Sequence, residues 1–271
     1  MIRDASPADL PALRALFARA NDAPYDLAAV AEEKCFGHGI AGEPAVRVYG
    51  ETEGASVTCG KWLRVLIVNR EARRKGIGSA LLADAERRGV SVIAAEPGNY
   101  FMPGVLEAEA GFFRKRRYVE TAVTWNLFAS TTAPHPNPLP ARAGRGDRDR
   151  VLTFIEEHFG RIWRFEAAKA FERDEPTLFI TEEDGAITGF AAHDVNNRGL
   201  GFFGPTGVAK SMRGRGLGCE LLRASLADLH RLGYARTVIP WTDALDFYRK
   251  CSGAEAAHRF LGFAKQVKGK G

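Results

Sequence analysis

The chain has 271 residues, 45% of them apolar, which is enough for two globular domains of ordinary size and a sizeable core. It has no run near the ~18 apolar residues of a membrane span and carries charge where a signal peptide would be apolar, so we expect a cytoplasmic protein with no membrane partner. The net charge of +5 favours anionic ligands, but the basic clusters show no reading helix or interleaved aromatic surface, so nucleic acid is not an expected partner.

The four cysteines form no recognisable metal or disulfide pattern. They are Cys35, Cys59, Cys219 and Cys251, which lie far apart and include no C-x-x-C pair. Zinc ribbons and disulfide frameworks are recognised by characteristic spacings that are missing here. We therefore predict ordinary reduced thiols and no metal site.

The first half predicts a helix, a hairpin and a third strand that leads into the glycine-rich segment "RRKGIGSALL", residues 73–82. An apolar helix follows and ends near Gly89. After it come a short apolar strand, the segment "AGFFRKRRY" (110–118) and a last strand. The predicted strands are, in order, 45–49, 56–59, 62–68, 90–95 and 119–128.

Residues 131–150 predict a linker. The segment has four prolines, several arginines and almost no apolar residue that could anchor it. Its "PHPNPLPARAGRG" resembles the translated palindromic repeats of bacterial genomes, and the alternative is a proline-rich docking peptide. The predicted domains are residues 1–130 and 151–271, with 131–150 between them.

The second half repeats the order of the first. Its glycine-rich segment is "RGRGLGCELL" (213–222), and the helix that follows ends near Gly233. The predicted strands are 178–181, 187–192, 200–208, 235–240 and 258–267. A whole structural unit is therefore predicted twice.

A glycine-rich segment at the start of a helix is suited to an anion, because the first-turn N–H groups and the helix dipole both face it. A dinucleotide-binding G-x-G-x-x-G needs a glycine at position 219, where Cys219 stands. A P-loop in "GPTGVAKS" (204–211) fails because Ala209 precedes the lysine. Neither nucleotide motif fits.

Both copies match a third pattern, R/Q-x-x-G-x-G/A, and the chain resembles a tandem protein of the GNAT acyltransferase superfamily. The resemblance implies an α/β fold of two GNAT-type domains, each with a mixed, mostly antiparallel central sheet flanked by helices. It also implies that backbone amides of the two loops hold the pyrophosphate of acetyl-CoA, the co-substrate. The implied acetyl-CoA-binding residues are Arg73, Arg74, Lys75, Gly76, Ile77, Gly78 and Ser79 in the first half, and Val208, Arg213, Gly214, Arg215, Gly216, Leu217, Gly218 and Cys219 in the second.

The second half also carries "DALDFYRKCSGA" (243–254), which resembles the family's next landmark, A…F-Y-x-x-x-G. A tyrosine with a pKa of ~10 is protonated at neutral pH and can donate a proton to a leaving thiolate, the role that the resemblance implies for Tyr248. Phe113 stands at the matching position of the first half, so we expect catalysis in the second half. Tyr100 or Tyr118 could restore an activity in the first.

The sequence identifies the general base less clearly. Asp243 either orients or deprotonates the amine, or caps the following helix. Asp194 and Glu96 are weaker candidates for the base.

The expected reaction is acetyl transfer to a primary amine of a small molecule or peptide. Trp241 and Trp163 either pack against a sugar ring or fill the core. "NYFMPGV" (99–105) resembles a stretch of two-domain GNAT proteins, some of which act on amino sugars, so an amino sugar is one candidate. The alternative function is a non-catalytic acyl-CoA-binding regulator.

Overall fold

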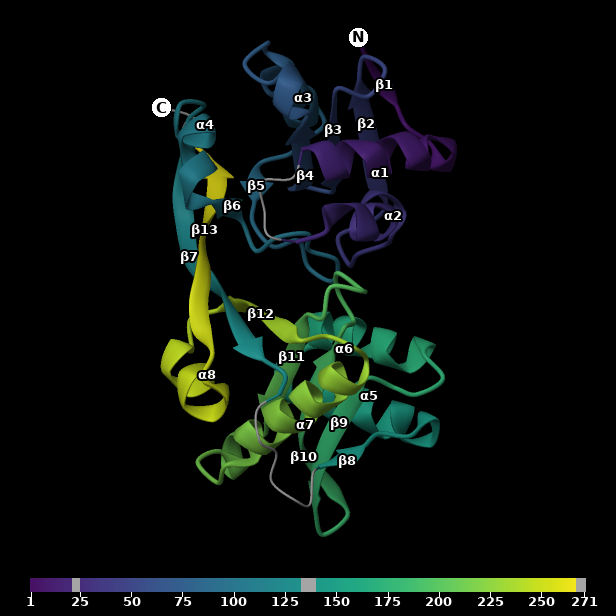
Figure 1. Cartoon of the computed structure of the whole chain (residues 1–271), viewed down its shortest axis with the longest axis vertical. Helices are drawn as coiled ribbons and strands as arrows, with labels where there is room; N and C mark the ends of the chain where they lie inside the picture. The colour runs from purple at the N-terminus through teal and green to yellow at the C-terminus, as the bar shows by residue number, and fades with distance from the viewer. Residues whose placement is uncertain (21–24, 133–139, 267–271) are drawn as a thin grey trace. The chain divides into compact units, whose positions relative to one another are not determined.

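The computed structural model describes residues 1–20, 25–132 and 140–266. The chain forms two compact units: unit 1 comprises Met1–Thr124 with Arg259–Gly271, and unit 2 comprises Trp125–His258. Two long strands, β7 (Tyr118–Ser130) and β13 (Glu255–Lys265), contribute residues to both units (Figure 1).

Unit 1 is a sheet whose strands follow the order β1-β2-β3-β4-β5-β13-β7, with β6 beside β13. Neighbours are antiparallel from β1 to β4 and between β5 and β13, whereas β4 and β5 are parallel. Helix α3 contacts β2, β3 and β4, and α1 contacts β4. The elements are β1 (Ile2–Asp4), α1 (Leu10–Arg19), α2 (Ala31–Phe36), β2 (Pro44–Tyr49), β3 (Gly54–Cys59), β4 (Trp62–Val68), α3 (Ile77–Arg87), β5 (Val92–Ile93), β6 (Val105–Leu106) and α4 (Ala110–Arg114).

Unit 2 has the antiparallel order β8-β9-β10-β11, and its strand β12 pairs with the second part of β7. Phe202, the residue before β11, forms a parallel β-bridge with Val238 of β12. The elements are β8 (Ala141–Arg142), α5 (Arg148–Phe159), α6 (Arg161–Ala168), β9 (Leu178–Glu183), β10 (Ala186–His193), β11 (Phe203–Val208), α7 (Leu217–Arg231), β12 (Arg236–Thr242) and α8 (Leu245–Ser252).

The core of unit 2 follows from the two-residue period of its strands. Leu178 and Ile180 of β9 pack in the cluster with α5, whereas Phe179 between them packs in the cluster with α7 and α8. Phe190 and Ala191 of β10 divide in the same way. The sheet therefore has helices on both faces, and the predicted mixed, mostly antiparallel α/β fold is confirmed.

Residues 140–150, the later part of the segment predicted as a linker, form regular structure in unit 2. Residues 133–139 lie outside the described residues, but Ala141 and Arg142 form strand β8 against β9, Ala143 is fully buried, and α5 begins at Arg148. The guanidinium of Arg142 pairs with the carboxylate of Asp228 on α7. An ion pair therefore holds residues 140–150 against the rest of unit 2, and the composition of the segment does not predict it.

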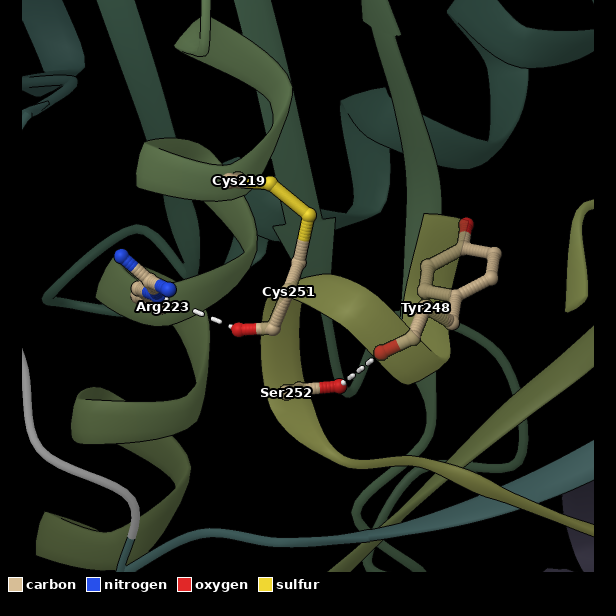
Figure 2. The surroundings of a disulfide bond; sticks show 5 residues. All are labelled: Cys219, Arg223, Tyr248, Cys251 and Ser252. Carbon is tan, nitrogen blue, oxygen red and sulfur yellow. Dashed lines mark hydrogen bonds between the residues drawn. A yellow bond between two sulfur atoms is a disulfide. The ribbon is translucent and has the colours of Figure 1, made fainter. Parts of the chain in front are cut away.

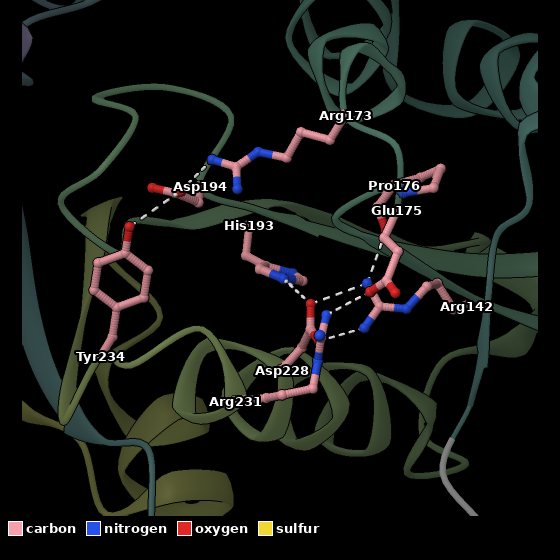
Figure 3. Close-up of polar contacts among 9 residues, drawn as sticks. All are labelled: Arg142, Arg173, Glu175, Pro176, His193, Asp194, Asp228, Arg231 and Tyr234. Atoms are coloured by element: carbon pink, nitrogen blue, oxygen red, sulfur yellow. Dashed lines mark hydrogen bonds and ion pairs between the residues drawn. The ribbon is translucent and has the colours of Figure 1, made fainter.

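Asp228 is the centre of a buried polar cluster that joins α7 to β8 and β10 (Figure 3). Its carboxylate accepts hydrogen bonds from Arg142, from Arg231, and from Nε2 of the fully buried His193 at 2.8 Å. Burial raises the pKa of Asp228, but these hydrogen bonds outweigh burial and hold the pKa below its usual range. Burial lowers the pKa of His193, against the opposing effect of Asp228.

His193 is neutral in the folded state. Its Nδ1 atom is buried without a hydrogen-bond partner, which suits the bare nitrogen of a neutral ring and not the N–H of a charged one. The unfolded chain binds a proton at this residue below a pH of ~6.5, and the folded chain, in which the pKa of His193 is lowered, binds it only at a lower pH.

We therefore expect the free energy of unfolding to fall as the pH is lowered from about 7.5 to about 5.5. His193→Gln keeps a neutral donor for Asp228 and should flatten this slope, as measured by urea unfolding at several pH values. His258, whose pKa burial also lowers, provides the comparison: His258→Gln should remove less of the slope because its side chain is less deeply buried. An unchanged slope in His193→Gln would contradict the assignment.

Candidate functional site

The two glycine-rich loops have the same conformation. Arg74 and Gly214 are left-handed, with φ of 66° and 81°, and so are Gly76 and Gly216, with φ of 84° and 87°. In each loop the first arginine turns back onto the strand it follows. Arg73 Nε donates to the carbonyl of Val68 at 3.2 Å, and Arg213 Nε donates to the carbonyl of Val208 at 3.3 Å. These two arginines shape the loops.

Each loop presents backbone N–H groups at the start of a long helix. Gly76 and Gly216 are the N-caps of α3 and α7, and neither helix start has a side-chain cap. Alternating left-handed residues ahead of a helix form a concave anion site, and the helix dipole adds to the attraction. The loop residues therefore suit a pyrophosphate. Arg215, an expected acetyl-CoA-binding residue, pairs with the Glu183 carboxylate through its two terminal guanidinium nitrogens, at 2.9 and 2.6 Å.

Beside each loop, two parallel strands meet at one point and are not paired beyond it among the described residues. The meeting points are Trp62 with Val92 in unit 1 and Phe202 with Val238 in unit 2. In both units the loop arginine bonds to the strand residue six positions after the meeting point, Val68 or Val208. The two sites therefore have the same spacing along the chain.

In unit 1 a buried ion pair joins the two segments that follow the meeting point. Arg64, two residues after Trp62, forms a fully buried, two-pronged ion pair with Glu96, four residues after Val92. Arg64 also donates to the carbonyls of Lys34 and Gly37, at 3.1 and 2.7 Å. Glu96, a weak candidate base, is therefore committed to a structural ion pair.

In unit 2 the same positions are Gly204 and Thr242. Gly204 has φ of 115°, and a Cβ added to it would meet no atom within 4 Å. Gly204 and Thr242 do not form the ion pair seen in unit 1, and there is open space beside Gly204.

Tyr248 lies on α8 in unit 2. It is 9% exposed, and its hydroxyl has no hydrogen-bond partner among the residues that the structure describes. Its ring packs edge-on against Phe203 at the start of β11 and against Phe247. Burial raises the pKa of Tyr248 to about 12. The phenol is thus protonated at neutral pH and its proton is available.

The contacts of α4 and α8 establish which residue replaces Tyr248 in unit 1. A Cβ on Gly218 would lie 3.2 Å from the Phe247 ring, and one on Gly78 would lie 3.6 Å from the Phe112 ring. Phe112 therefore corresponds to Phe247, and the next residue, Phe113, to Tyr248.

Of the two tyrosines that the sequence suggested as a replacement for that hydroxyl, Tyr118 is held by another contact. The Tyr118 hydroxyl donates to the Glu86 carboxylate at 3.1 Å, and burial, followed by the negative charge of Glu86, raises the Tyr118 pKa well above its usual range. Tyr100 is 6% exposed and follows the buried Asn99, which binds Lys34.

Helices α7 and α8 are joined by a disulfide between Cys219 and Cys251 (Figure 2). The expectation of four reduced thiols is wrong for this pair, because residues 32 apart in sequence lie with their Cα atoms 5.2 Å apart. Arg223 Nε donates to the Cys251 carbonyl at 3.1 Å and adds a second link. Cys251 lies one turn after Tyr248, so the disulfide fixes the helix that carries the phenol to the first turn of α7.

The equivalent contact in unit 1 is a hydrogen bond. Arg116, three residues after Phe113, donates to Ser79 Oγ on the first turn of α3 at 2.5 Å. Ser79 corresponds to Cys219 and Arg116 to Cys251. The helix junction is therefore duplicated, with a covalent link in only one copy.

The candidate bases of unit 2 have different surroundings. Asp194 is fully buried and bonds to Arg173 and Tyr234 (Figure 3). It also accepts the backbone N–H of Gly199, so it is a structural residue. Asp243 is exposed. Helix α8 has Ala244 as its N-cap with no side-chain cap, so the capping interpretation of Asp243 is wrong.

The two tryptophans also differ. Trp163 stacks on Phe159 and belongs to the apolar cluster beneath α5 and α6. Trp241, at the end of β12, is 47% exposed.

Residues 148–254 match the model of the acetyltransferase (GNAT) family. The chain carries a GNAT acetyltransferase domain. The matched range contains the second glycine-rich loop, the parting of β11 and β12, and Tyr248. The N-terminal region, outside this match, repeats the fold and the loop geometry.

Solved structures share this fold over nearly the whole chain. The glucosamine N-acetyltransferase region of a fungal multi-domain GH3 β-N-acetylglucosaminidase has a TM-score of 0.76 at 18% identity, over 97% of this chain and 38% of that one. A GCN5-related N-acetyltransferase from Sphaerobacter thermophilus has 0.72 at 22%, over 98% and 95%. A tandem GNAT protein from the clavulanic acid biosynthesis pathway has 0.67 at 16%, over 97% of each.

At these identities the likeness concerns the fold. No curated protein sequence matches the chain. Among the described residues, no helix has the length and apolarity to cross a bilayer, and no group of three or more His, Cys, Asp or Glu could hold a metal.

The disulfide gives a prediction for thiol labelling. Burial raises the pKa of Cys35 to about 12 and that of Cys59 to about 11, so neither forms appreciable thiolate at neutral pH. Iodoacetamide should label no cysteine of the native protein before reduction and two after it, Cys219 and Cys251, as counted by mass spectrometry of peptides. Labelling of Cys219 without reductant would contradict the pairing. The Cys219→Ser/Cys251→Ser variant should lose about 3 kcal/mol of unfolding free energy.

Proposed function

We propose that unit 2 is an acetyl-CoA-dependent N-acetyltransferase that acts on a primary amine. The observation that carries this proposal is the buried Tyr248, whose hydroxyl lacks a partner beside an open pair of parting strands and a pyrophosphate-binding loop. No other described residue of unit 2 combines a free acidic proton with this position.

In the proposed reaction the neutral amine attacks the thioester carbonyl carbon of acetyl-CoA. A C–N bond forms, the C–S bond breaks, and the electron pair of that bond goes to sulfur. Tyr248 gives its proton to the departing sulfur, and the proton lost by nitrogen returns to the phenolate through Asp243 or water. The GNAT resemblance assigns oxyanion stabilisation to a backbone N–H on the strand before the loop, here β11.

The Tyr248 environment supports an acid and not a base. With a pKa of about 12 the phenol is fully protonated at neutral pH and stronger than water as an acid. Because burial alone raises the pKa, no neighbouring group competes for the proton. Asp243, exposed and free of a capping role, is the residue we assign to the substrate ammonium.

Unit 1 is proposed to bind acyl-CoA without catalysis. Its loop, residues Arg73–Ser79, has the same left-handed geometry as Arg213–Cys219 with three consecutive cations, but its opening holds the Arg64–Glu96 pair and Phe113 has no hydroxyl. These features favour the role of a non-catalytic acyl-CoA-binding regulator for unit 1 and not for unit 2.

For the acceptor we propose an amino sugar. One structural neighbour is a glucosamine N-acetyltransferase region, and the exposed Trp241 at the end of β12 suits a sugar ring. Small amines and peptide N-termini remain the other acceptors to compare.

Tyr248→Phe should reduce kcat about 100-fold, because the leaving thiolate loses its proton donor, while the affinity for acetyl-CoA stays near that of the wild type. Coenzyme A release with a panel of primary amines measures the first quantity and calorimetry the second. Tyr118→Phe, which removes a buried tyrosine hydroxyl that bonds to Glu86 in unit 1, should leave kcat unchanged. Full activity of Tyr248→Phe would refute the assignment.

A pair of loop variants counts the binding sites. Valine strongly disfavours the φ of 84° at Gly76 and 87° at Gly216, so each Gly→Val substitution should disable its own loop. Calorimetry with acetyl-CoA should give two sites for the wild type and one for each variant. Gly185→Val carries similar strain, with φ of 78° in the β9–β10 turn, and should keep two. One site in the wild type would remove the role proposed for unit 1.

A further inference from the structure

Trp241 combines three properties that core tryptophans do not have. It is 47% exposed, it has φ of 52°, and it stands in a bulge of β12. A left-handed backbone is unusual for a bulky aromatic residue, and such strain persists only where the surroundings impose it.

The surroundings do impose it. Ile239 pairs with Leu127 and Thr242 with Trp125, so two residues of β12 lie opposite the single residue Asn126 of β7. Asn126 is fully buried, and its Oδ1 accepts the backbone N–H of Trp241 at 3.1 Å. The bulge and this hydrogen bond hold the strained backbone, and the side chain projects to the surface.

Trp241 lies where the proposed chemistry occurs. It is the third residue after Val238, the bridge beyond which β11 and β12 are not paired among the described residues. Asp243 follows two residues later, and then α8 with Tyr248. The matching residue of unit 1, three after Val92, is the buried Ala95, beside the filled opening.

We propose that Trp241 is the platform on which the acceptor's ring stacks, and that the acceptor is an amino sugar in its pyranose form. This rests on the function proposed above. A pyranose presents a flat face of C–H groups that an indole can cover. Asp243, exposed and two residues after Trp241, is the carboxylate we assign to its ammonium group. Asn126 is a positioning residue, because it holds the backbone of Trp241 and not the acceptor.

The test compares a ring amine with a linear one. With D-glucosamine as acceptor, Trp241→Ala should raise KM about tenfold and Trp241→Phe less. With ethanolamine, which has the ammonium and a hydroxyl but no ring, KM should change less than twofold. The KM for acetyl-CoA should be unchanged in both variants. Trp163→Phe, in the core of the same unit, should leave both amine KM values unchanged.

Tryptophan fluorescence gives a readout independent of turnover. D-glucosamine should quench the emission of the wild type and of Trp163→Phe, but not that of Trp241→Phe. Asn126→Leu, which removes the acceptor of the Trp241 N–H, should raise the D-glucosamine KM as Trp241→Ala does, and Asn126→Asp, which keeps an oxygen there, should restore part of it.

The outcomes separate this inference from the function on which it rests. No turnover of any amine by the wild type refutes the proposed function. Turnover of other amines without D-glucosamine, an unchanged D-glucosamine KM in Trp241→Ala, or an equal rise for both amines overturns the platform alone.

Discussion

The site depends on two parallel strands that touch once and then separate. Phe202 and Val238 form the bridge between the lines of β11 and β12, and beyond it no pairing links these strands among the described residues. Parallel neighbours that stay paired leave no room for a ligand between them. The separation brings the glycine-rich loop after β11, the bulge in β12 and the helix after β12 to the same end of the sheet.

Duplication makes the physical difference between the units easy to locate. The loops share their left-handed residues and even the arginine that bonds to the preceding strand. The units differ in what fills the opening: a buried ion pair in unit 1, and Gly204 with open space in unit 2. A buried ion pair that loses one partner is strongly destabilising, so the filled state of unit 1 resists reversal by single substitutions.

The sequence predicted the features that are local in the chain. The β9–β10 turn follows from Asp184-Gly185, both left-handed, and the two loops from glycine spacing at a helix start. The sequence does not predict contacts between residues that lie far apart along the chain. The Cys219–Cys251 pair and the Arg64–Glu96 pair each join segments about 32 residues apart, and neither has a spacing motif. The sequence does not distinguish the roles of Trp163 and Trp241 because exposure is a tertiary property. The predicted cap at Asp243 is wrong because α8 begins at Leu245, with Ala244 as its N-cap.

In each unit the helix after the glycine-rich loop is linked to the segment that carries Phe113 or Tyr248. The two links respond differently to salt and to heat. In unit 1 the junction is the Arg116–Ser79 hydrogen bond, which breaks and reforms at thermal energies and weakens in concentrated salt. In unit 2 it is a covalent bond, which is indifferent to ionic strength and to modest heating. The spacing between the glycine-rich loop and the segment that follows it with Phe113 or Tyr248 is therefore adjustable in unit 1 and constant in unit 2, the unit that carries the phenol.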